Sequence, residues 1–309
     1  MIKKYSILIF FLMSISSFSQ VPSEEIKIFT LSDFDLKGKV KKCLVGKKYG
    51  KEEYQFDSIG RLQKSITRFN DMDYDLVLYK YQQAELIEKR SESYRNNIFD
   101  PTISIGHFFT IDTTNNKKIT EKIISYDNQF LEQYIYQYNA KDILESITTI
   151  TENGVDLTAI TQEVSEGKKV TNFKENKEII KSTTITNKIA KDSSVSKIVL
   201  RKEYLHGAPF RGVEETYDPL GLLVEKKEFG YDETSKDLHV VAQNSYLYSN
   251  SGILSEQVIK RGKQVTKSTF IYQNDEKGNW IREIIIPENT YTTRKIEYYA
   301  VKDQVEATL

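Results

Sequence analysis

The sequence predicts an all-β protein in which antiparallel hairpin repeats stack into an extended, twisted sheet or an open β-solenoid-like array. Three observations predict this fold: short runs that alternate β-branched and aromatic residues, turn clusters between them, and one aromatic and glycine pattern that recurs. The chain has 309 residues, 39% of them hydrophobic, and a mean hydropathy of −0.50. It is thus too apolar for a disordered chain and too polar for a bundle of membrane helices.

Residues 1–19 have the features of a secretory signal peptide. Lys3 and Lys4 precede an apolar run at 7–13, which a serine-rich stretch follows before Gln20. The apolar run is shorter than the roughly 20 residues that span a bilayer, and no later stretch is apolar for that long. We therefore expect an exported protein, periplasmic or extracellular, that is soluble after cleavage and has no membrane span.

Charge argues against a nucleic-acid partner. The chain carries 44 basic and 44 acidic residues, and without residues 1–19, which hold two lysines and no acid, the net charge is −2. The basic runs at 37–48 and 260–267 are interrupted by apolar residues and glycine, so we interpret them as solvated strand faces. The single Cys43 cannot form an internal disulfide and is expected as a buried free thiol. The oligomeric state stays open.

Period-two alternation places the strands in order along the chain. The clearest runs are at 64–69, 132–138, 182–186, 267–272, 282–286 and 294–299. Turn clusters separate them at 57–60, 153–154, 218–221, 250–252, 261–262 and 274–278. The best candidate for a helix, 81–93, is short and also fits a strand, so low helix content is expected.

One pattern recurs: an aromatic, any residue, an aromatic, Asp or Asn, a few turn residues, Gly, then Leu or Trp two places later. Clear copies lie at 54–62, 217–223, 246–254 and, in a longer form, 270–280. Weaker copies begin at Tyr126 and Tyr136. The step from Tyr248 to Tyr272 is 24 residues and the step from Tyr272 to Tyr298 is 26, which fits one hairpin per repeat at roughly 3.3 Å per residue.

Each repeat position has a physical role. The Asp or Asn is expected to accept hydrogen bonds from turn N–H groups, and the Gly to supply a positive φ. These structural turn residues are Asp57, Gly60, Asp218, Gly221, Asn250, Gly252, Asp275 and Gly278. We divide the chain into a signal peptide (1–19), an N-terminal strand or cap segment (20–49), the repeat array (50–300, degenerate over 95–205) and a tail (301–309).

The Tyr-Asp-x-x-Gly-x-Leu units, with Asp-Glu-Lys-Gly-Asn-Trp at 275–280 and Arg-Lys-Ile-Glu-Tyr-Tyr at 294–299, resemble the YD repeats of the bacterial Rhs family. The resemblance is to short exported repeat proteins without a toxin domain. In large members the hairpins form a shell around a toxic C-terminal domain, which nothing after Tyr299 resembles, so encapsulation is not expected. MORN-like repeats give similar hairpins. Residues 95–205 are Thr-rich and Gly-poor, which indicates atypical repeats or an inserted β-layer.

Catalytic patterns are sparse. His107, His206 and His239 are far apart and without H-E-x-x-H or paired cysteines, so we interpret them as surface or hairpin residues. The chain has no nucleophile elbow and no phosphate-binding glycine loop. Asp71, Asp73 and Asp75 could ligate Ca²⁺ but lack the Gly and distal Glu of a known loop. We expect no catalytic residue, metal or cofactor.

Aromatic side chains are the remaining candidates for binding, because rings on a sheet can stack on sugars or peptides. The candidates are Tyr134, Tyr136, Tyr138, Tyr246, Tyr248, Tyr272, Trp280, Tyr298 and Tyr299. The competing interpretation is that most of them pack between repeats. The favoured hypothesis is a non-enzymatic binding protein for an envelope or extracellular protein or glycan. The alternatives are an envelope enzyme acting on polysaccharide with carboxylates from separate strands, and an accessory module of a secreted toxin system.

Overall fold

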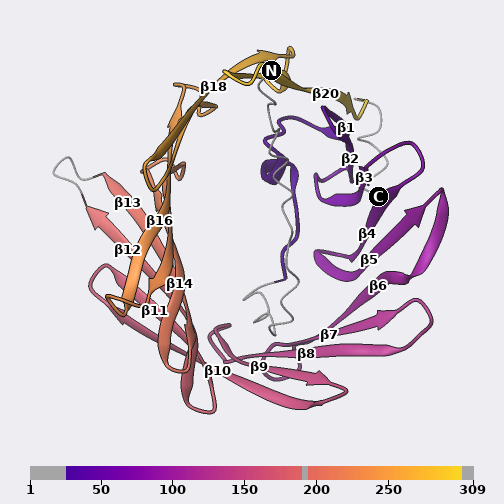
Figure 1. The fold of residues 1–309 in the computed structure, drawn as a ribbon. Helices are drawn as coiled ribbons and strands as arrows, with labels where there is room; N and C mark the ends of the chain where they lie inside the picture. Colours follow the sequence, from indigo (N-terminus) through magenta and orange to yellow (C-terminus); the bar gives the residue numbers. More distant parts are fainter. Residues whose placement is uncertain (1–25, 190–193, 301–309) are drawn as a thin grey trace, which may run out of the picture.

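A computed structural model describes residues 26–189 and 194–300 of the chain. They form twenty antiparallel strands and one short 3₁₀ helix, which confirms the all-β hairpin prediction. Each strand pairs with the next one along the chain, and the first also pairs with the last, so the sheet closes into a barrel (Figure 1). The predicted signal peptide and tail lie outside the described residues.

The elements follow one another around the ring without a crossover. In chain order they are η1 (Leu31–Phe34), β1 (Val40–Lys47), β2 (Gly50–Phe56), β3 (Leu62–Arg68), β4 (Tyr74–Gln82), β5 (Glu85–Arg95), β6 (Ile98–Asp112), β7 (Lys118–Ser125), β8 (Phe130–Tyr138), β9 (Leu144–Thr151), β10 (Gly154–Ser165), β11 (Lys168–Glu175), β12 (Glu178–Ile189), β13 (Val195–Leu205), β14 (Ala208–Tyr217), β15 (Leu223–Asp232), β16 (Asp237–Tyr248), β17 (Leu254–Arg261), β18 (Gln264–Asn274), β19 (Trp280–Ile286) and β20 (Thr290–Tyr298). The described residues of this stretch, 95–189 and 194–205, thus continue the same sheet and form no inserted layer.

The open array predicted from the sequence is wrong, because β1 is paired on both sides. Cys43 lies opposite Tyr54 on β2 and opposite Ile296 on β20. Strand twist curves a long antiparallel sheet, and closing it pairs the backbone groups that free edges would expose. Alternation of residues along a strand is the same in an open and in a closed sheet, so the sequence pattern could not distinguish them.

A segment of residues 26–39, here called the central segment, runs through the inside of the ring before β1 begins (Figure 1). It contains η1. The Phe34 ring lies 4.5 Å from that of Tyr54 and 5.3 Å from that of Phe56, centre to centre. Phe29 similarly lies 6.2 Å from Tyr79. These contacts identify the inward face of the wall, since residues opposite each other on paired strands share a face.

The buried apolar core forms where the wall meets the central segment. One cluster, packed against Phe29, Leu31 and Phe34, contains Leu36, Val40, Cys43, Val45, Phe56 and Leu62. The other, packed against Ile26, contains Ile119, Tyr136, Tyr138, Leu144, Ile147, Ile160 and Phe173. Cys43 is a buried free thiol, and burial raises its pKa to about 11. The core therefore depends on a strand wall and on a segment that is not part of it.

Backbone hydrogen bonds hold the central segment against the turn between β2 and β3. The Leu31 amide donates to the Gly60 carbonyl at 3.0 Å, and the Leu62 amide donates to the Phe29 carbonyl at 2.9 Å. The central segment thus forms a short stretch of backbone hydrogen bonds with the turn between β2 and β3, on the inner side of the wall.

Asn279, in the turn between β18 and β19, holds the other end of the segment. Its side-chain oxygen accepts the Lys37 amide at 2.6 Å, and its side-chain nitrogen donates to the Lys37 carbonyl at 2.9 Å and to the Tyr298 hydroxyl at 2.6 Å. Asn279 is 1% exposed, so water cannot replace these partners.

We expect Asn279→Ala to lower the free energy of unfolding by about 1–3 kcal/mol, because it removes the two partly buried hydrogen bonds with the Lys37 backbone and the one with Tyr298. Urea unfolding followed by circular dichroism measures this, with the exposed Asn116→Ala as the matched control. Equal stability of the two variants would contradict the role given to Asn279.

Candidate functional site

The aspartates of the repeat turns bond the turn backbone. Their Oδ1 atoms accept the amides two and four residues later, at 3.1 and 2.8 Å for Asp57, 2.9 and 2.8 Å for Asp218, and 2.9 and 2.9 Å for Asp275. The glycines of these turns have φ values of 90° at Gly60 and 83° at Gly221. Only glycine adopts this backbone region without strain.

Two further turns reach the same shape with other residues. In the 246–254 copy, Ser249 and not the predicted Asn250 receives the amide of Ile253, at 3.2 Å, and Gly252 has φ 77°. At 139–143 the cap is Asn139, which accepts two turn amides at 2.9 and 3.1 Å. Ser, Asn and Asp all supply an acceptor on a short side chain, so the sequence Ser-Asn-Ser-Gly left two equivalent choices.

All of these turns lie at one end of the barrel. In an up-and-down barrel each turn that follows an even-numbered strand is at the same rim. The repeat turns at 57–61, 139–143, 218–222, 249–253 and 275–279 all follow even-numbered strands. The repeat aspartates therefore lie at separate places around one rim. Each of them bonds the backbone of its own turn.

Tyrosine hydroxyls connect three of the repeat turns, or the strand that begins directly after the turn, to a strand further along the chain. Tyr81 donates to the Leu62 carbonyl at 2.6 Å, and Tyr248 donates to the Leu223 carbonyl at 2.7 Å. In the same way Tyr298 contacts the Asp275 carboxylate in the β18–β19 turn. Tyr81 was missed by the sequence analysis, although Tyr-Lys-Tyr at 79–81 is an aromatic pair of the repeat type.

The predicted aromatics on β8 lie on the inward face. Tyr136 is 2% exposed and Tyr138 9%, and both belong to the core cluster that packs on Ile26. Tyr136 donates to Glu121 at 3.0 Å, and the other oxygen of this carboxylate lies 2.7 Å from Nδ1 of His107. His107 is therefore not a surface residue, because its strand position turns it into the barrel.

The remaining aromatics include a group beside the central segment. The Arg294 guanidinium lies 3.5 Å from the ring centre of Trp280 and donates to the Phe34 carbonyl at 2.9 Å. Tyr272 lies 6.0 Å from Trp280 and donates to Glu283 at 3.0 Å. Burial lowers the pKa of Arg294. These side chains are engaged with one another and with the central segment.

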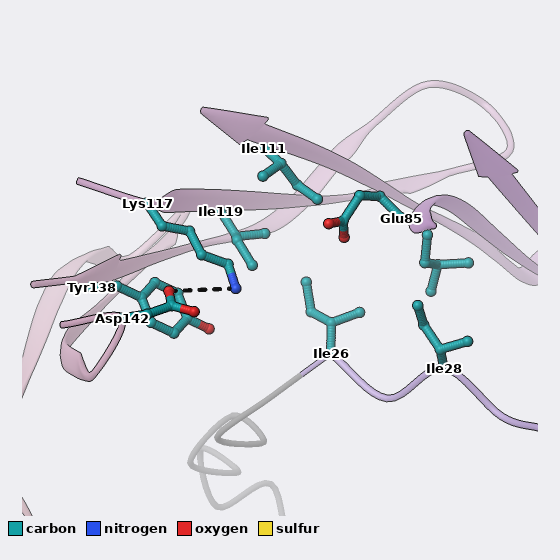
Figure 2. A pocket seen from close by; sticks show the side chains of 9 residues that line it. Ile26, Ile28, Glu85, Ile111, Lys117, Ile119, Tyr138 and Asp142 are labelled. Carbon is teal, nitrogen blue, oxygen red and sulfur yellow. Dashed lines mark ion pairs between the residues drawn. The ribbon is translucent and has the colours of Figure 1, made fainter. Parts of the chain in front are cut away.

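A pocket of about 250 Å³ lies between the central segment and the inner wall (Figure 2). Aliphatic side chains form its floor, and charged side chains and a tyrosine surround them. The lining residues are Ile26, Ile28, Glu85, Leu86, Ile111, Lys117, Ile119, Tyr138 and Asp142. Most come from ends of strands at the rim of the repeat turns, which explains why no local sequence motif signalled the pocket.

Charge in the pocket is unbalanced. Lys117 Nζ lies 3.6 Å from the Asp142 carboxylate and 4.8 Å from the Tyr138 ring centre. The Glu85 carboxylate has no ion-pair or hydrogen-bond partner in the part of the chain that the structure describes. One cation against two anions leaves the pocket with a formal charge of −1, and aliphatic surface lies directly beside it.

The other candidates for chemistry are separate. His206 lies in the β13–β14 turn with φ 50°, and His239 is exposed on β16. Asp73 bonds Asn70 and the Asn96 amide, and Asp75 pairs with Arg95 at 3.0 Å. Within residues 26–189 and 194–300 no three metal-ligating side chains converge. No helix in these ranges is long and apolar enough to cross a membrane.

Comparison of the sequence with family profiles and with curated proteins gives no match. Among solved structures, a porin-like protein from Bacteroides uniformis is similar over 84% of this chain and 96% of its own, with 10% identity and a TM-score of 0.34. A porin-like protein from Bacteroides vulgatus covers 85% and 99%, with 8% identity and a TM-score of 0.27. TcdB2-TccC3-TEV covers 79% of this chain and 14% of its own, with 11% identity and a TM-score of 0.34.

We expect Tyr248→Phe to lower the free energy of unfolding by about 0.5–1.5 kcal/mol, since it removes the hydrogen bond to Leu223 and keeps the ring. Tyr231→Phe is the control, because Tyr231 is 40% exposed. Chemical denaturation of both variants measures the difference. A neutral Tyr248→Phe would mean that the hydroxyl does not link the repeats.

We expect Asp275 to contribute to acid sensitivity. Burial raises the pKa of its carboxyl, but hydrogen bonds from Tyr298 and from two turn amides outweigh this and place the pKa below the usual 3.8. The stabilisation is therefore complete above pH 3.8 and is lost as the pH falls through the lowered value.

The measurement is the melting temperature of wild type and Asp275→Asn between about pH 5 and pH 3. The melting temperature of the wild type should fall more than that of the variant over this pH range. Parallel curves for the two proteins would show that Asp275 has no such role.

Proposed function

We propose that this is an exported, non-enzymatic binding protein that holds a partner protein through the pocket between its central segment and its inner wall. The observation that carries the proposal is the combination of aliphatic lining with the Glu85 carboxylate beside it, which has no partner among the residues that the structure describes. Small-molecule and side-chain sites have this composition: mostly apolar walls and a few polar groups that fix orientation.

A lysine or arginine side chain of the partner fits this composition. Its aliphatic stem would pack on Ile26, Ile28 and Ile111, and its charge would approach Glu85 and Asp142. A sugar would leave aliphatic walls without matching contacts, because its hydroxyls need polar partners on several sides. The pocket thus favours a protein over a glycan at this place.

Export as a soluble protein is part of the proposal and rests on the signal-peptide pattern of residues 1–19. On the outward face, ion pairs lie beside exposed apolar side chains such as Leu247 and Val265, and the ion pairs favour contact with water. Lys227 lies 3.2 Å from Glu214 on the neighbouring strand and 2.8 Å from Glu225 on its own strand, and Lys267 lies 2.6 Å from Glu256 on the neighbouring strand. Charged side chains of this kind are stable in contact with water.

The two alternative functions, a polysaccharide-acting enzyme and an accessory module of a toxin system, have less support. A polysaccharide-acting enzyme needs two acids that converge on a substrate. The repeat aspartates Asp57, Asp218 and Asp275 each bond their own turn, and of the two acids in the pocket, Asp142 is paired with Lys117. An accessory role in a toxin system rests on the Rhs-like repeat pattern, and toxin genes beside this gene would favour it.

We expect short synthetic peptides with one lysine or arginine among aliphatic residues to bind, and glutamate analogues of the same peptides not to bind. Glu85→Lys should weaken binding by about tenfold or more, because it reverses the charge of the pocket. The matched control is Glu166→Lys, an exposed glutamate in the β10–β11 turn at the same rim.

Fluorescence anisotropy of labelled peptides measures the affinities. Binding that is equal for the lysine and glutamate peptides, or equally weakened by both variants, would contradict the proposal, as would the absence of binding by every basic peptide.

A further inference from the structure

We propose that the outward face of β4–β7 carries a second site, which binds a neutral sugar ring of a glycan. This site is on the opposite face of the wall from the inner pocket and does not depend on the function proposed for that pocket. The proposal rests on a row of aromatic rings, on a hollow at the end of this row, and on the balance of charge around it.

The strand register places these residues on the outward face. Tyr79 contacts Phe29 of the central segment, and it pairs with Lys89, which in turn pairs with His107. These residues therefore face inward, and their neighbours in the strands face outward. Arg90 and Gly106 are such neighbours and lie opposite each other.

Four aromatic rings follow one another across this face. Tyr74 and Tyr94 are stacked, with ring centres 4.6 Å apart and an interplanar angle of 9°. Tyr94 lies 5.6 Å from Phe99, and Phe99 lies 4.9 Å from Tyr126. These are the spacings of favourable aromatic contacts, so each ring covers part of the next and the row is rigid.

Glu92 fixes the tyrosines in place. Its carboxylate accepts the Tyr94 hydroxyl at 2.9 Å and also the Tyr126 hydroxyl. Burial and the hydrogen bond to Glu92 raise the pKa of Tyr94 to about 12, so its hydroxyl remains a donor at neutral pH. Rings held by a supporting carboxylate lose little freedom when a ligand binds.

The row ends at a hollow of about 200 Å³, lined by Arg90, Gly106, Phe108, Ile124, Tyr126 and Asn128. Gly106 leaves the hollow open: a Cβ atom there would lie 2.9 Å from the Phe108 ring. Phe108 is 36% exposed. A ring-shaped ligand in the hollow would continue the aromatic row beyond Tyr126.

The polar groups at the hollow fit a neutral polyhydroxyl ring. Arg90 is paired with Glu88 and interacts with the Tyr126 hydroxyl, so the hollow has no excess of positive charge that would select an acidic ligand. Guanidinium and amide N–H groups of Arg90 and Asn128 can donate to sugar oxygens, and the Asn128 amide oxygen can accept from a sugar hydroxyl. The C–H face of a sugar would meet Phe108 and Tyr126.

The test is binding of hexamers of β-1,4-glucose, α-1,4-glucose and β-1,4-N-acetylglucosamine to the whole protein, measured by isothermal titration calorimetry. We expect at least one hexamer to bind with a Kd of about 1 mM or lower. Gly106→Ala should weaken this binding by about tenfold, because the added methyl displaces Phe108 and fills the hollow. The φ of Gly106 is not in the left-handed region, so alanine is tolerated by the backbone.

Phe108→Ala is the second variant, and Tyr291→Ala, an outward tyrosine on β20 that is 58% exposed, is the control. Melting curves check that all three variants are folded. Weaker hexamer binding by both Gly106→Ala and Phe108→Ala, with unchanged binding by Tyr291→Ala, supports the site. No binding of any hexamer, or equal loss in the control, overturns it. Binding only of aromatic peptides, lost in Gly106→Ala, also overturns it and assigns the hollow to a protein.

Discussion

The structure depends on one constraint: a barrel of twenty strands is too wide for its own inward side chains to fill. The central segment solves this by placing Phe29, Leu31 and Phe34 against the inward face of β1–β4. Both buried apolar clusters in the described part of the chain have contacts from this segment. Burial of apolar area is the main favourable term in folding, so the barrel is stabilised where the segment touches it.

The same constraint determines where binding surfaces can occur. Beside Ile26 and Ile28 the segment does not fill the space to the wall, and the inner pocket is what remains there. A pocket bounded by a wall on one side and by a non-strand segment on the other combines residues from distant parts of the sequence. Its apolar floor is continuous with the core, while Glu85, Lys117 and Asp142 come from the rim.

The repeat has a structural role in this arrangement. Its Asp or Ser side chains shape the turns at one rim, and the hydroxyls of Tyr81 and Tyr248 connect two of these turns to the next hairpin. A hairpin alone is marginally stable in water, so links between hairpins are what make a long meander cooperative. Tyr136, one of the aromatic residues proposed from the sequence as a binding residue, is instead packed in the core on the inward face of the barrel.

The sequence by itself determined the strands, the hairpin repeat and the chemistry of the turns, because alternation, turn propensity and glycine conformation act over a few residues. It could not choose between Ser249 and Asn250 as a turn cap, because both carry a suitable acceptor. Closure of the ring, the inward position of His107 and both pockets were decided by the tertiary structure. These features depend on which strands meet β1 and on where residues 26–39 run, and contacts over such distances in the chain leave no local pattern.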